Sequence, residues 1–242
     1  MKTLASYPFF FLCCGLAWSE LKTVRRCLRE KVIIFPEQAT KNYVQLHAND
    51  TMDFPGITVC LRFYTDESSK NQSLFSLATP SEANDFTISL SPINLYKLQV
   101  HGTSSEFNGL PFKLNRWNSV CATWNSVSGF AQVFVDEVPS VQKAVAVKNA
   151  FKGDSKVVLG QSHKSYANVD FMQDLAFTGF ITDVHVYKEV LTPRLIKNFM
   201  EAKIKFKLGD YINWRNLKHT VAGSASVEPR QHVTFYTNQE EN

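Results

Sequence analysis

The chain lacks the features that mark a membrane-spanning protein or a common enzyme. The apolar run at residues 9–17 is far shorter than the roughly 20 residues that a transmembrane helix needs, and no later segment approaches that length. The sequence contains no Gly-x-Ser-x-Gly, His-Glu-x-x-His, phosphate-binding loop or dinucleotide fingerprint. No strand-like segment carries the closely spaced carboxylates that glycosidases use. The sequence therefore predicts neither a membrane span nor an enzyme.

An excess of charge of one sign is also missing. There are 26 Lys and Arg residues against 22 Asp and Glu residues, a formal net charge of +4. This imbalance is too small to predict nucleic acid as a partner.

The first 19 residues are typical of a secretory signal. Lys2 precedes the apolar run, and Ala17-Trp18-Ser19 fits a small-x-small cleavage site. We predict a secreted, extracellular protein whose mature chain starts at Glu20. Residues 20–31 then form a basic arm, residues 32–231 form one folded domain, and residues 232–242 form a polar tail.

Removal of the signal leaves three cysteines. Cys60 and Cys121 each lie in the middle of a strand-like segment, at residues 56–64 and 116–126, and we predict a disulfide between them. Cys27, in the basic arm, is the odd one. An odd cysteine in an oxidising compartment indicates either a bond to another chain or a free thiol, and both alternatives stay open.

Alternating and short apolar segments predict an all-β fold. The segment 116–126 has a period of two, which places Trp117 and Trp124 on opposite faces of a buried strand. Further strand candidates are residues 32–36, 86–90, 96–101, 130–135 and 157–159. Their spacing is typical of a two-sheet sandwich or jelly roll.

Two segments after residue 190 have other patterns. Thr192 and Pro193 are suited to the start of a short helix, whose apolar residues would be Leu195, Ile196 and Phe199. Beyond it, lysines alternate with apolar residues over 202–208, which predicts an edge strand whose lysines block pairing with another chain.

Several motifs together resemble the pentraxin family. Cys60 is followed about sixty residues later by Cys-Ala-Thr-Trp-Asn-Ser at residues 121–126, although Ser119 replaces the family's usual histidine. Other matching segments are residues 133–136, 158–161, 179–181, 191–193 and 213–217, so that the resemblance covers about residues 31–231. It implies an antiparallel jelly-roll sandwich of two sheets with one short helix packed on one sheet.

The resemblance also implies a function. Pentraxins bind rather than catalyse, and they act in innate pattern recognition or debris binding. We therefore expect a lectin-like protein that recognises an extracellular glycan, phospholipid or protein ligand, and that forms a homo-oligomer, a pentamer by resemblance.

The family holds two calcium ions with an early Asp-Asn pair and a later acidic loop. The resemblance carries this role over to Asn84, Asp170 and Gln173, the last two only if the loop contains a deletion and an insertion. Ala83, Ser162 and Lys164 stand where the family has acids. Because calcium needs 6 to 8 oxygen ligands with substantial carboxylate charge, we expect calcium binding to be weak or absent.

Asn49 and Asn71 begin Asn-x-Ser/Thr triplets in polar segments, and we predict glycosylation at both. Two alternatives to a pentraxin function stay open. One is an extracellular interaction module like laminin G or concanavalin, and the other is a carbohydrate-active enzyme whose carboxylates meet only in the folded chain.

Overall fold

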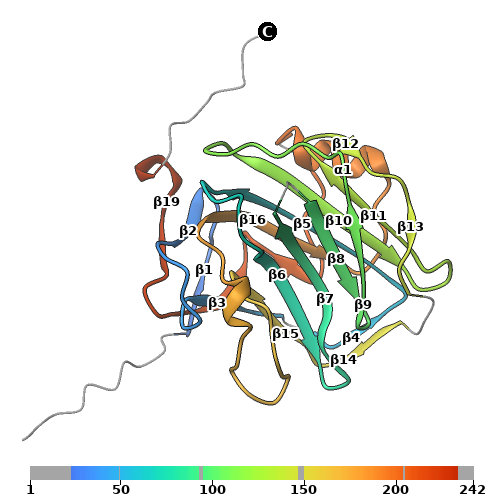
Figure 1. Ribbon diagram of the computed structural model, residues 1–242, viewed down its shortest axis with the longest axis horizontal. Helices are drawn as coiled ribbons and strands as arrows, with labels where there is room; N and C mark the ends of the chain where they lie inside the picture. The colour runs from blue at the N-terminus through green and yellow to red at the C-terminus, as the bar shows by residue number, and fades with distance from the viewer. Residues whose placement is uncertain (1–22, 49, 93–94, 147–149, 204, 234–242) are drawn as a thin grey trace, which may run out of the picture.

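Two antiparallel sheets lie face to face, and α1 (Pro193–Met200) lies outside one of them (Figure 1). The computed structural model describes residues 23–48, 50–92, 95–146, 150–203 and 205–233. This architecture confirms the predicted all-β jelly-roll sandwich with one short helix. The predicted signal, residues 1–19, lies outside the described residues, and so does most of the predicted tail.

The eight-stranded sheet has the order β1 (Thr23–Arg26), β18 (Leu217–Ala222), β3 (Tyr43–His47), β15 (Lys156–Leu159), β6 (Gln72–Thr79), β7 (Glu82–Ser91), β8 (Leu95–Val100), β9 (Thr103–Phe107). The nine-stranded sheet has the order β12 (Val138–Pro139), β11 (Phe130–Val135), β10 (Asn118–Asn125), β5 (Gly56–Tyr64), β16 (Gly179–Tyr187), β2 (Lys31–Phe35), β19 (Ser226–Pro229), with β13 (Lys143–Ala144) on β11 and β17 (Ile212–Asn213) on β16. A small third sheet joins β14 (Phe151–Gly153) to β4 (Met52–Phe54). Two short 3-10 helices are η1 (Gln173–Leu175) and η2 (Arg230–His232).

The main core fills the space between the two large sheets. Alternate residues of strand β10 face opposite sides of the sheet. Val120, Ala122 and Trp124 point into this core, whereas Cys121 belongs to a separate cluster beneath α1. The predicted alternation is thus confirmed within β10. Trp117 precedes the strand and is half-buried against Tyr64.

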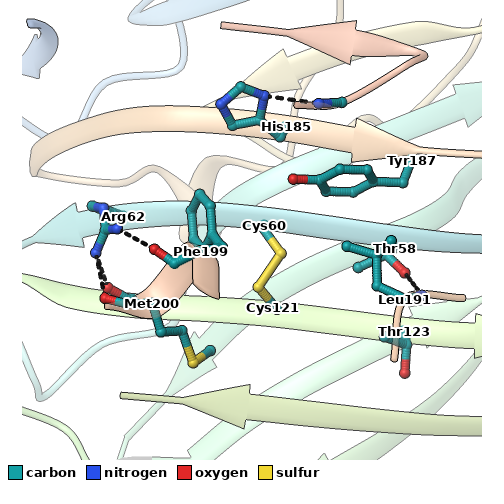
Figure 2. Close-up of a disulfide and its surroundings, with 12 residues drawn as sticks. Thr58, Cys60, Arg62, Cys121, Thr123, His185, Tyr187, Leu191, Phe199 and Met200 are labelled. Atoms are coloured by element: carbon teal, nitrogen blue, oxygen red, sulfur yellow. Dashed lines mark hydrogen bonds between the residues drawn. A yellow bond between two sulfur atoms is a disulfide. The ribbon is translucent and has the colours of Figure 1, made fainter. Parts of the chain in front are cut away.

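The predicted disulfide between Cys60 and Cys121 is confirmed. The two residues face each other on the neighbouring strands β5 and β10, with their Cα atoms 4.1 Å apart. The bond lies on the outer face of the nine-stranded sheet, next to Phe199 of α1 (Figure 2), and Ile196 of α1 belongs to the same buried cluster. Strand β5 is therefore buried on both faces, by the core on one side and by the helix on the other.

A buried arginine fixes the end of the helix on this face. Arg62 of β5 donates hydrogen bonds to the carbonyl oxygens of Phe199, at 2.5 Å, and Met200, at 3.4 Å. Its Nε lies 3.1 Å from Oδ2 of Asp183. These carbonyls belong to the last turn of α1, where backbone oxygens lack helical partners, so the guanidinium caps the helix and holds it to the sheet.

Two predictions about elements were wrong. A strand, β1, precedes the one expected to be the first, and it pairs with β18 at the edge of the eight-stranded sheet. The segment expected as a lysine-rich edge strand, 202–208, contains no strand among its described residues. Instead, Phe206 packs on Phe199 and His185, while Lys203 and Lys207 pair with Glu201 and Glu189. No helix among the described residues is long and apolar enough to cross a membrane.

Candidate ligand and metal site

The candidate site lies on the outer face of the eight-stranded sheet. The segment between β15 and β16 leaves the sheet as a loop beside β15 (Figure 1). Its beginning and end are joined by a bridge between His163 and Phe171. The backbone of Lys164 donates to Asp170, and that of Met172 donates to Ser162, each at 2.9 Å. The loop therefore closes on itself and covers the polar outer residues of β6 and β7.

Asn84 of β7 is the centre of a buried hydrogen-bond network beneath this loop. Its side-chain oxygen accepts hydrogen bonds from the hydroxyls of Ser76 at 3.0 Å, Ser162 at 2.8 Å and Thr87 at 3.3 Å. Its amide nitrogen donates to the carbonyl oxygen of His163 at 2.7 Å. The Asn84 side chain is thus enclosed by protein partners, and its residue is only 4% exposed.

His163 completes the network. Its Nδ1 lies 2.8 Å from the hydroxyl oxygen of Ser76, and the residue is buried. Burial lowers the pKa of His163 to about 4, and the nearby charge of Lys156 acts in the same direction. The imidazole is therefore neutral at physiological pH. The other members of the network are an amide and hydroxyl groups, so it carries no net charge.

Asp85, next to Asn84, is also committed to protein partners. Its Oδ1 lies 2.5 Å from Nδ1 of His101, and its Oδ2 accepts a hydrogen bond from Thr79 at 2.9 Å. The ring of His101 packs edge-on against Trp124, with centroids 4.9 Å apart. This largely buried pair ties β7 to the turn after β8, and both carboxylate oxygens have partners outside the Asn84 network.

The structure does not bring the three predicted metal ligands into one cluster. Asn84 is buried, whereas Asp170 and Gln173 are exposed side chains on the loop and in η1. Asp170 lies 3.7 Å from Lys164, in an ion pair whose two side chains are about half exposed. Such an exposed pair contributes little to stability, but it places the positive charge of Lys164 beside the carboxylate of Asp170.

This arrangement does not fit a calcium ion. Calcium needs several oxygens with carboxylate charge at about 2.3–2.6 Å. Here the Asn84 oxygen is enclosed by hydroxyls, Asp85 faces a histidine, and Lys164 lies next to Asp170. Among the described residues no three His, Cys, Asp or Glu side chains form a group that could hold a metal.

Sequence reasoning missed His163 and its hydroxyl partners. The sequence shows only that acids are absent around residues 161–164, not what replaces them. Ser76, Thr87 and Ser162 come from three separate segments. They meet because β6 pairs with both β7 and β15, so that Ser76 is opposite Thr87 on one side and opposite Val158 on the other. This register is not readable from one sequence.

The other predicted site residues lie away from this network. Cys27 is exposed, immediately after β1, and is the one free cysteine of the described residues. Asn71 is exposed immediately before β6, and Ser73 of its triplet is buried. Asn49 lies outside the described residues.

Comparisons with known proteins agree on one group. The model of the Pentaxin family matches residues 31–229. C-reactive protein of Sus scrofa is 30% identical over 200 residues, which cover 83% of this chain and 87% of that protein. Serum amyloid P-component of Cavia porcellus is 29% identical and covers 84% of this chain and 89% of its own length.

Solved structures show the same fold. A heptameric pentraxin of Limulus polyphemus, similar to serum amyloid P, has a TM-score of 0.75 at 22% identity, covering 86% of this chain and 99% of that one. The extracellular region of zebrafish Gpr126 has a TM-score of 0.65 at 13% identity, covering 84% of this chain but 26% of that one.

Proposed function

Because this chain belongs to the Pentaxin family, we propose that it is a secreted, lectin-like recognition protein rather than an enzyme. Relatives named C-reactive protein and serum amyloid P-component support a binding role in innate recognition or debris binding. Its ligand would be an extracellular glycan, phospholipid or protein. The proposal includes one departure from the family, namely that binding does not require calcium.

One observation supports binding without calcium. The Asn84 side chain, which the resemblance assigns to calcium, already has hydrogen-bond partners on both its oxygen and its nitrogen. Calcium would have to displace three hydroxyls from that oxygen, and the loop beyond offers Asp170 together with the cation of Lys164. The neutral network instead holds the loop in place without an ion, which supports recognition by a loop that is ordered in the absence of metal.

A glycan and phospholipid array tests the proposal directly. We expect the same ligands to be bound in calcium and in excess chelator. Isothermal titration should give no calcium dissociation constant tighter than about 10⁻³ M, the limit of weak extracellular sites. A micromolar constant that Asp170→Ala abolishes, while the exposed control Asp154→Ala keeps it, would show that a calcium site is present after all.

Secretion and glycosylation can be tested together. Asn71 is exposed on the surface, and glycosylation there requires passage through the secretory pathway. We expect the secreted protein to lose mass on treatment with a glycosidase that removes N-linked glycans. Asn71→Gln and Asn49→Gln, separately and together, assign the two sites. Intracellular retention of the full-length chain would contradict the proposal.

The family relationship also supports a homo-oligomer. Val138, in the edge strand β12 of the nine-stranded sheet, and Val141, just after it, are 42% and 71% exposed, so they offer apolar surface that a second subunit could cover. Light scattering should give a mass several times that of one chain, and Val141→Asp should lower it. A monomeric mass would favour the alternative, an interaction module like laminin G or concanavalin.

Cys27 offers a covalent link between subunits, because it is exposed at the start of the described chain. If it forms such a bond, non-reducing gels show a dimer that Cys27→Ser removes. Identical bands with and without reductant leave it as a free thiol, which alkylation of the native protein would label.

A further inference from the structure

A hollow of about 290 Å³ opens beside the Asn84 network, between the loop and the turn that precedes β3. It is lined by Thr40, Lys41, Tyr43, Val169, Asp170 and Phe171. This volume is at the small end of the range for ligand sites. It suits one ring-sized group better than an extended chain.

The wall that carries Thr40 and Lys41 is held rigidly from behind. The buried amide of Gln161 donates to the carbonyl oxygens of Ala39 at 2.8 Å and Asn42 at 3.0 Å. The buried side chain of Asn42 donates to the carbonyl of Glu37 and accepts a hydrogen bond from the backbone of Ser224. The turn is therefore fixed on both sides of Lys41 before any ligand binds.

The opposite wall is also fixed. Phe171 is buried, pairs through its backbone with His163, and packs against Tyr43 with ring centroids 4.8 Å apart. On the far side of the loop, Nζ of Lys156 donates to the carbonyl of Tyr166 and lies 4.6 Å from the centre of its ring. Because both walls are ordered, a ligand would lose little affinity to the ordering of the protein.

The groups that line the hollow combine an aromatic surface with few polar side chains. Lys41 is exposed and makes no ion pair with any described residue. Partial burial raises the pKa of Tyr43, so its hydroxyl stays protonated at neutral pH and can donate a hydrogen bond. Val169 is 66% exposed, which adds an apolar side chain to the rim of the hollow.

These groups match different parts of a sugar. The C–H face of a sugar ring can lie on Tyr43 and Val169, and its hydroxyls can donate to the carboxylate of Asp170. The ammonium group of Lys41 favours a carboxylate or sulfate on the same ring. A quaternary ammonium headgroup would instead need a cage of aromatic faces without a cation.

We propose that this hollow binds one acidic sugar unit of an extracellular glycan, without calcium. The proposal rests on the proposed function as a lectin-like protein, and it assigns both the ligand class and the site. Lys41 binds the acidic group, Asp170 binds hydroxyls, and Tyr43 supports the ring.

The test is titration of the intact protein, in chelator, with glucuronate-terminated and sulfated disaccharides and with their neutral counterparts. Wild type should bind the acidic sugars at least tenfold more tightly than the neutral ones. Lys41→Glu should weaken that binding on the order of tenfold or more, since it reverses the charge of the one lysine that lines the hollow, whereas Lys164 is paired with Asp170. The matched control is Lys152→Glu, an exposed lysine on β14, which should leave affinity within about twofold. Val169→Ser should weaken binding of both kinds of sugar about equally.

The outcomes separate this site from the wider proposal. If wild type binds array glycans in chelator but Lys41→Glu changes nothing, the hollow is not the site while the calcium-independent lectin function stands. If wild type binds no glycan in chelator, both the assignment of the hollow and the calcium-independent lectin function are wrong. Equal binding of inorganic sulfate and sulfated sugar, or binding of phospholipid vesicles that Lys41→Glu abolishes, would overturn the assignment to a sugar.

Discussion

The two outer faces of the sandwich each hide polar groups under a cover, but they hold the cover differently. On the nine-stranded sheet, α1 lies over the disulfide and is held by the charged group of Arg62 (Figure 2). On the eight-stranded sheet, the loop lies over Asn84 and is held by neutral hydroxyls and an imidazole. The helix cover thus depends on a covalent bond and a buried charge, whereas the loop cover depends on many weaker neutral contacts. We therefore expect a single substitution under the helix to lower the free energy of unfolding strongly, and a single substitution under the loop to lower it only slightly.

Arg62 should show the largest effect. Arg62→Ala removes a buried guanidinium that is the partner of two helix carbonyls, of Ser119 and of the partly exposed Asp183. We expect a loss of about 3–5 kcal/mol in the free energy of unfolding. The control is Lys188→Ala, which breaks an exposed pair with Asp50 and should cost at most about 1 kcal/mol. Denaturant unfolding measures both, and equal costs would contradict the comparison.

The disulfide should come next. The double variant Cys60→Ala with Cys121→Ala releases a loop of 61 residues in the unfolded chain. We expect a loss of about 2–4 kcal/mol. The helix should remain ordered because Arg62 still caps it, so far-ultraviolet circular dichroism of the folded variant should be unchanged. Peptide mapping of the unreduced wild type that finds either thiol free would show that the bond is not formed in solution.

The dependence of the unfolding free energy on pH tests a buried histidine on each of the two faces. Burial lowers the pKa of His163, on the loop face, to about 4, and burial lowers that of His185, on the helix face, to about 4. Since the ordinary value is 6.5, the unfolded chain binds more protons between pH 6.5 and 4, and stability falls as the pH falls through this window. Each histidine should lower the free energy of unfolding by about 2 kcal/mol at pH 5 relative to pH 7.5.

Variants separate the two contributions. His163→Gln and His185→Gln should each flatten the decline in unfolding free energy between pH 7.5 and 5. His232→Gln, at an exposed position, should leave the decline unchanged. His185 also accepts a hydrogen bond from the backbone of Gly209 at Nδ1, a contact that protonation of that nitrogen abolishes. A decline that neither buried variant alters would refute the assignment.

Ser162→Ala should have the smallest effect. It removes one of three hydroxyls that donate to Asn84, at 2.8 Å, and leaves the other two. We expect a loss of about 1 kcal/mol. Hydrogen exchange should show faster opening of the loop around His163, while the region around α1 is unaffected. A loss as large as that of Arg62→Ala would mean that the loop face is not held by dispersed contacts.

The sequence predicted those structural features that depend on a pattern within a single segment. The alternation in β10, the mid-strand positions of Cys60 and Cys121, and Thr192-Pro193 at the start of α1 are all local patterns, and the structure confirms them. It failed on residues 202–208 because alternation there arises from separate ion pairs and from Phe206, not from strand pairing. It also did not find the Asn84 network, since three hydroxyls and an imidazole meet there only through the register of β6, β7 and β15.

The order of strand pairing has a consequence for how the protein is made. Among the described residues, the four strands that precede residue 55 pair only with strands that begin at Phe151 or later: β1 with β18, β2 with β16 and β19, β3 with β15 and β18, and β4 with β14. At about 5–20 residues per second, the ribosome delivers the first of these partners, β14, roughly 5–20 s after β4, and the last, β19, roughly 9–35 s after it. During that interval four strands have unpaired edges, and contacts of such long sequence separation form slowly. Strands between residues 56 and 144, such as β6 to β9 and β5 with β10, can pair with one another earlier. We therefore expect folding to be completed only near the end of synthesis, with chaperones binding the unpaired N-terminal strands until then.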